Sequence, residues 1–101
     1  MTETKRLTDE ELREIEQRAE RATPGPWGVE RSLDEADVYE ITESSEFLSP
    51  IVAETRFLAD AEFIAHARKD IPRLIAEVRR LQELVNQYEA LAFLSKKIQE
   101  G

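Results

Sequence analysis

The chain has 101 residues and a mass of 11.7 kDa, which is enough for one small domain with a modest core. Hydrophobic residues make up 41% and charged residues 36%, a composition that favours an ordered, strongly helical protein over a disordered one. The 22 acidic and 14 basic residues give a net charge of -8, which argues against binding to duplex nucleic acid or an anionic membrane.

The absence of cysteine excludes disulfides, thiolate metal sites and a cysteine nucleophile, and it is typical of a protein in a reducing cytoplasm. The first residues lack the apolar run of a signal peptide, and no stretch of about 18 apolar residues occurs. We therefore expect a soluble cytoplasmic protein that does not span a membrane.

The first element begins after a capping box, in which Thr8 is followed three residues later by Glu11. A helix is expected from about Asp9, with a thin apolar stripe and an otherwise charged surface. The segment Thr23-Pro24-Gly25-Pro26 ends it, because proline cannot donate a backbone hydrogen bond.

Three short segments follow that are rich in aromatic and β-branched residues: 27–31, 38–42 and 50–57. We predict three antiparallel strands with one buried face. In the third, the alternation of a strand places Ile51, Ala53, Thr55 and Phe57 on one face and Val52, Glu54 and Arg56 on the other.

From Ala59 the apolar period becomes helical, with Asp60 in the first turn, where the helix dipole favours a negative charge. Asp70-Ile71-Pro72 is expected to start another helix, since proline is accepted in a first helical turn. The sequence thus predicts a short helix and then a long one running to about Gln99.

The long helix carries the clearest pattern of the sequence, an apolar seam with alternating spacings of three and four that is typical of a coiled coil. The seam consists of Ile71, Leu74, Val78, Leu81, Val85, Tyr88 and Ala92, and Leu84, Leu91, Leu94 and Ile98 widen it. Some 28 residues would form a rod of about 42 Å, whereas a compact domain of this size has a radius of gyration of about 13 Å. A second copy is the simplest partner, with the residues from Val78 onward as the oligomer interface.

The overall expectation is a single α+β domain over residues 1–101. Residues 1–70 would form a body with an N-terminal helix, a small three-stranded antiparallel sheet and a short helix. Residues 71–100 would form the long coiled-coil-like helix.

The sequence offers little chemistry. His66 is the only histidine and has no second histidine or cysteine with which to share a metal. Acidic pairs such as Asp34 with Glu35 are explained by turns and capping, and no dinucleotide-binding or phosphate-binding glycine loop is present. We expect no catalytic residue, no metal and no cofactor, and therefore no enzyme.

One basic region stands out in the acidic chain, around Arg68, Lys69 and Arg73. It could hold the phosphates of a small anionic ligand, with Trp27 and Tyr39 stacking on a base. The alternative is that the basic residues, including Arg79 and Arg80, pair with acidic neighbours one helical turn away and that Trp27 anchors the core.

Two segments carry a resemblance to a family: Ala22-Thr23-Pro24-Gly25-Pro26-Trp27, and the run from Ala59 to Arg68 ahead of the long helix that starts with Ile71 to Val78. Together they resemble the Ead-like family of small phage and prophage accessory proteins, over about a quarter of the chain. The resemblance implies a protein in the cytoplasm of a host bacterium that modulates host processes.

The expected layout is also similar to that of phage anti-defence proteins of the Thoeris-inhibiting sponge type, which are oligomers that sequester nucleotide immune signals. That similarity implies a ligand site near Asp60, Arg68 and Arg73.

Three hypotheses remain open from the sequence. The first is a non-catalytic phage-type accessory protein that self-associates and binds a host protein. The second is an oligomeric sponge for a nucleotide signal, and the third is a structural or scaffolding oligomer.

Overall fold

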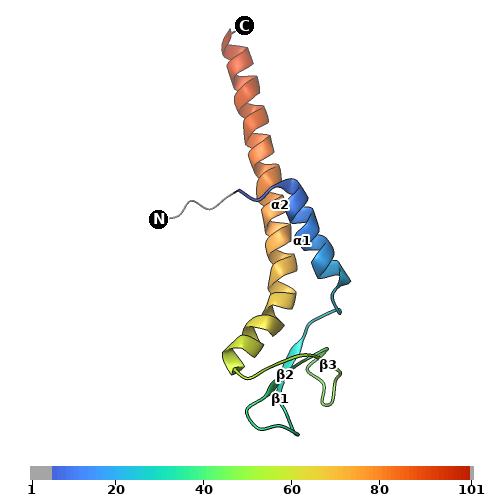
Figure 1. Cartoon of the computed structure of the whole chain (residues 1–101). Helices are drawn as coiled ribbons and strands as arrows, with labels where there is room; N and C mark the ends of the chain where they lie inside the picture. Colours follow the sequence, from blue (N-terminus) through green and yellow to red (C-terminus); the bar gives the residue numbers. More distant parts are fainter. Residues whose placement is uncertain (1–5, 101) are drawn as a thin grey trace.

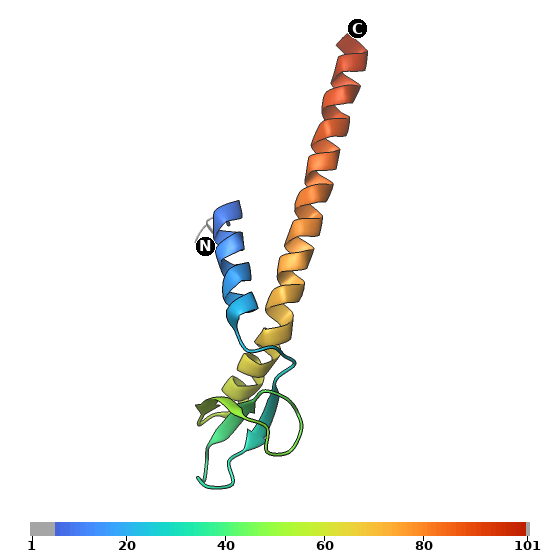
Figure 2. The same ribbon diagram turned by 90° about the vertical axis from the view of Figure 1, so that its right-hand side faces the viewer.

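A computed structural model describes residues 6–100 as two helices and a three-stranded sheet (Figure 1). The elements are α1 (Asp9–Arg21), β1 (Gly28–Arg31), β2 (Tyr39–Thr42), β3 (Ile51–Thr55) and α2 (Leu58–Glu100). The sheet lies at the N-terminal end of α2, and α1 lies beside the following part of that helix (Figures 1 and 2). The predicted layout of an N-terminal helix, an antiparallel sheet and a long C-terminal helix is confirmed.

Helix α1 begins at the predicted capping box. The Thr8 hydroxyl accepts a hydrogen bond from the Glu11 backbone N–H at 3.0 Å, and the Glu11 carboxylate accepts one from the Thr8 N–H at 3.0 Å. These bonds favour the charged carboxylate, so the Thr8 backbone N–H lowers the pKa of Glu11. The helix ends at Arg21, just before the Pro-Gly-Pro segment, as expected.

The sheet has the order β1-β2-β3 with antiparallel neighbours. Its inner face packs on the first turns of α2, where fully buried Ile41 contacts Ala61 and Ala65. Trp27, Val29 and other half-buried side chains surround this cluster. The core is small, because a three-stranded sheet offers one short face to one helix.

The predicted faces of the third strand are partly wrong. The pairing shifts between Ile41 and Thr42, so that Ala53 faces Ile41 while Ile51 faces Thr42. Val52 is the extra residue of this bulge, and it packs against the core while Ile51 is half exposed. Phe57 lies beyond the strand and is exposed. A bulge breaks the period of two, which a sequence pattern does not reveal.

The outer face of the sheet carries a row of three glutamates. Glu30 pairs with Glu40, and Glu40 pairs with Glu54, so the three carboxylates lie side by side across the strands. Like charges directly opposite one another destabilise a sheet.

We therefore expect Glu40→Gln to raise the free energy of unfolding by about 0.2–1 kcal/mol, because it removes the shared member of both repulsive pairs. Urea denaturation at low salt measures the gain, which should shrink at 1 M salt as the charges are screened. The control is Glu46→Gln in the loop between β2 and β3, which should change nothing. A loss of stability in Glu40→Gln would contradict the prediction.

Helix α2 corrects the prediction of two helices. It runs without a break from Leu58 to Glu100, and Pro72 lies inside it. Proline fits helical dihedral angles and removes only one N–H, so packing on both sides of the position can hold the helix together. Ala61 and Ala65 are buried before Pro72, and Ile75 is buried one turn after it. The boundary expected between a body of residues 1–70 and a helix of residues 71–100 is therefore absent from the backbone.

Pro72→Ala is expected to raise the free energy of unfolding by up to about 3 kcal/mol, because it restores a helical hydrogen bond within α2. Thermal and urea unfolding followed by circular dichroism measure the change. Pro72→Gly restores the same N–H, but glycine has poor helix propensity. The stability of this variant should therefore fall between those of the unchanged protein and Pro72→Ala. If alanine brings no gain, contacts of the proline ring outweigh the missing hydrogen bond.

The long helix sets the shape of the molecule. Its 43 residues correspond to about 64 Å, and the molecule measures 75 × 33 × 18 Å. The radius of gyration is 20.8 Å, well above the value of about 13 Å for a compact chain of this length. The expected rod is thus present, and it is longer than the sequence indicated.

Candidate functional site

Polar contacts hold α1 antiparallel to one side of α2. Arg79 of α2 makes a two-point ion pair with Glu16 of α1, at 2.9 and 3.3 Å. The Gln82 amide donates to the Asp9 carboxylate at 3.3 Å. Leu12 is the buried residue of α1, and the apolar residues Ile15 and Ala19 are half-buried. The contacts end at the level of Gln82, so α1 covers only the proximal part of α2, residues 58–82.

Helix α2 also carries a long band of exposed apolar side chains, which we call the α2 stripe. The band begins beside α1, because Phe63 and Ile71 face Ile15 of α1 across a groove. Farther along, Val78, Leu81 and Val85 line a hollow together with Asp9. With 3.6 residues per turn, Leu81 and Tyr88 lie about 160–180° around the helix from Arg79. The α2 stripe comprises Phe63, Ile71, Leu74, Val78, Leu81, Leu84, Val85, Tyr88, Leu91, Ala92, Leu94 and Ile98. Of these, Val78 is half-buried and the others are exposed, with Tyr88 at 67% and Ile98 at 80%.

The C-terminal part of α2, residues 83–100, is the tail. Every one of its residues is exposed, and Figure 2 shows it projecting past α1 and away from the sheet. An isolated helix of 18 residues gains little from propensity alone, and most helical stability in proteins comes from packing of an apolar face. Most residues of the predicted oligomer interface, those from Leu84 to Ile98, therefore lie in the tail and are exposed.

Phe63 extends this surface beyond what the sequence indicated. It is 75% exposed and lies two helical turns before Ile71, on the part of α2 that was expected to form a separate short helix. A spacing of eight residues places Phe63 and Ile71 near the same face of one helix. The sequence pattern alone does not link them, because it predicts that the helix ends before Pro72.

Of the candidate ligand residues, the structure brings Trp27 and Arg68 together. The Arg68 guanidinium lies 6.0 Å from the centre of the Trp27 ring. Both side chains donate to the Thr23 carbonyl, Arg68 Nε at 2.8 Å and Trp27 Nε1 at 3.1 Å. Gly25 lies against the Arg68 side chain, where an added Cβ would come within 2.8 Å of Cγ. These contacts tie the Pro-Gly-Pro segment to α2, which is a structural role.

The other candidate ligand residues lie apart. Tyr39 is on β2, with the Arg31 guanidinium 5.9 Å from its ring centre. Asp60 is in the first turn of α2, as expected. Arg73 is five residues from Arg68, which places it about 140° around the helix. The five predicted residues therefore do not line one shared pocket.

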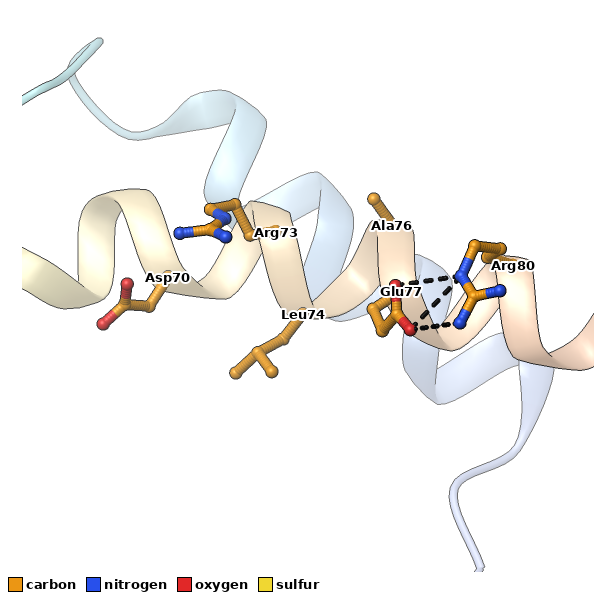
Figure 3. Close-up of a pocket in the computed structure, with 6 residues that line it drawn as sticks. All are labelled: Asp70, Arg73, Leu74, Ala76, Glu77 and Arg80. Carbon is orange, nitrogen blue, oxygen red and sulfur yellow. Dashed lines mark hydrogen bonds and ion pairs between the residues drawn. The ribbon is translucent and has the colours of Figure 1, made fainter.

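One hollow of about 710 Å³ is lined by six residues that all belong to α2, and Figure 3 shows them along successive turns. They are Asp70, Arg73, Leu74, Ala76, Glu77 and Arg80. Glu77 and Arg80 point toward each other and form an ion pair at 2.6 Å, in agreement with the predicted pairing of charges within the helix. The Arg80 guanidinium lowers the pKa of Glu77. A hollow with walls from one helix encloses no ligand.

A smaller groove of about 410 Å³ separates α1 from α2 and is mostly apolar. Ile15 and Ala19 of α1 form one wall, and Phe63, Ala67 and Ile71 of α2 form the other. Two of these α2 residues belong to the α2 stripe, so the groove is continuous with the exposed surface rather than a separate polar site.

Chemistry-bearing groups are sparse in the described part of the chain. Across residues 6–100, no group of three or more His, Cys, Asp or Glu side chains is placed to hold a metal ion. His66 is exposed on α2. Among the same residues, no helix is both long enough and apolar enough to cross a membrane.

Comparison with known proteins adds no relative: no family model, no curated protein and no solved structure matches the chain. The resemblance to the Ead-like family therefore stays a prediction.

Proposed function

We propose that this protein is a non-catalytic binding protein that self-associates through the α2 stripe and presents the body formed by α1 and the sheet to another molecule. The single observation that carries the proposal is the exposed apolar face of α2, which runs from Phe63 beside α1 to Ile98 at the end of the tail.

Self-association follows from the size of that surface. Monomeric proteins rarely expose long contiguous apolar patches, and such patches mark interaction sites. The heptad spacing of the α2 stripe suits the side chains of a second helix, which fill the spaces between turns. A second copy of the chain carries the same stripe and is always present wherever the first copy is. Symmetric homodimers are also the commonest oligomers of soluble proteins.

The proposed partner beyond the second copy is a host protein, in keeping with the resemblance to phage accessory proteins. Protein binding is favoured over catalysis because the exposed surface of α2 is rich in large apolar side chains, which are typical of protein interfaces. The candidate nucleotide ligands have less support, since Trp27 and Arg68 are engaged with Thr23 and with each other.

Light scattering coupled to size exclusion tests the self-association. We expect a mass at least twice the 11.7 kDa of one chain over micromolar concentrations. A mass of 11.7 kDa that is constant with concentration would overturn the proposal. Co-purification of a host protein with the intact chain, lost on mutation of the body but not of the tail, would support the second half of the proposal.

A further inference from the structure

The α2 stripe can be covered by a second copy in a parallel or an antiparallel arrangement, and charges on the chain distinguish the two. We propose that the protein forms an antiparallel dimer, in which the tail of each copy lies against the proximal part of α2 of the other. This inference rests on the proposed self-association and adds the direction and the register.

Charge is distributed unevenly along the chain. Of the 22 acidic residues, only Glu83, Glu89 and Glu100 lie in the tail, where Lys96 and Lys97 nearly balance them. The proximal part of α2 has 4 acidic and 5 basic residues, so the net charge of -8 belongs to residues 1–57, which include α1 and the sheet. A parallel dimer would place two acidic bodies side by side, within the range of about 10 Å over which charges interact in physiological salt. An antiparallel dimer separates them.

Local charges point the same way. Lys96 and Lys97 are exposed near the C-terminal end of α2, and Asp60 and Glu62 are exposed near its start. Antiparallel pairing brings these opposite charges together at both ends of the dimer, whereas parallel pairing places lysines beside lysines. Complementary charges of this kind select the orientation of a pairing more than they strengthen it.

The lengths are compatible with this arrangement. The tail of 18 residues spans about 27 Å, and the 25 residues of the proximal part span about 37 Å, so each tail fits within the exposed stripe of the other copy. The heptad spacing then centres the contact between Val78 and Leu81. Val78 faces Leu81 of the partner subunit, Leu74 faces Val85 of the partner subunit, and Ile71 faces Tyr88 of the partner subunit.

Distances between spin labels test the direction. The chain has no cysteine, so a single introduced cysteine carries a single label. Three exposed positions of α2 outside the seam suffice: His66→Cys, Arg80→Cys and Phe93→Cys. In the antiparallel dimer the two labels at position 93 are about 40 Å apart, and so are those at position 66. Position 80 lies near the centre and gives a distance within about 20 Å in either direction.

The outcomes separate the two proposals. Long distances at 66 and 93 with a short distance at 80 support the antiparallel dimer. Short distances at all three positions show a parallel pairing, which overturns this inference and leaves the proposed self-association standing. No coupling at position 80 together with a mass of 11.7 kDa overturns both. Circular dichroism of each labelled variant confirms that the helix is retained.

Discussion

Leu91→Asp is expected to convert the assembled protein to a single chain of 11.7 kDa in light scattering, at concentrations where the unchanged protein is at least a dimer. Leu91 is an exposed member of the α2 stripe in the tail, beyond the part of α2 that α1 covers. Burying an aspartate without a partner in an apolar interface costs several kcal/mol, so association should be lost. The fold of the single chain should be unaffected, because position 91 is exposed within it.

The matched control is Asn86→Asp, in the same tail. Position 86 is exposed but lies about 160° around the helix from Tyr88, with no member of the stripe one turn before or after it. It adds one negative charge as Leu91→Asp does, so it should leave the mass unchanged. If both variants dissociate, the tail associates through another face or through its net charge, and the proposed surface is wrong.

Ile41→Ala is expected to lower the free energy of unfolding by about 2–5 kcal/mol. Ile41 is fully buried at the centre of the sheet, against Ala61 and Ala65 of α2. Small domains are stable by only about 5–15 kcal/mol, and this core is small, so the variant should lose a large part of its stability. Urea denaturation at one fixed protein concentration measures the loss, because association contributes to apparent stability.

Ile51→Ala is the control for this change. It removes the same atoms from the same sheet, but Ile51 is 49% exposed where Ile41 is 0% exposed. Its cost should be well below that of Ile41→Ala. Equal losses at the two positions would show that the core does not lie between β2 and α2.

Features set by neighbouring residues were predictable from the sequence. The capping box of Thr8 and Glu11 and the stop at the Pro-Gly-Pro segment depend on contacts within a few residues, and both are present. The alternation of β-branched residues located the three strands to within one or two residues, and the heptad spacing located the exposed face of α2.

Features set by tertiary contacts were not predictable. The continuity of α2 through Pro72 depends on packing on both sides of that residue, which outweighs the local preference for a break. The bulge at Val52 depends on the pairing with β2. Arg79 was expected to pair within its own helix, but it pairs with Glu16, which is 63 residues away in sequence. For the candidate ligand site, the sequence identified residues of suitable chemistry but not whether they meet in space. Only the continuous helix shows that Arg68 and Arg73 lie on different faces.

The row formed by Glu30, Glu40 and Glu54 also affects how copies of this protein meet. A sheet of three short strands has two open edges, and such sheets can stack or extend into fibrils when many chains are present. Three carboxylates across the outer face repel the same face of any other copy, and this repulsion acts at every encounter in a concentrated solution. The charge that weakens the isolated sheet therefore opposes stacking of two copies through this face, and the proposed contact through α2 meets no such repulsion from the sheet.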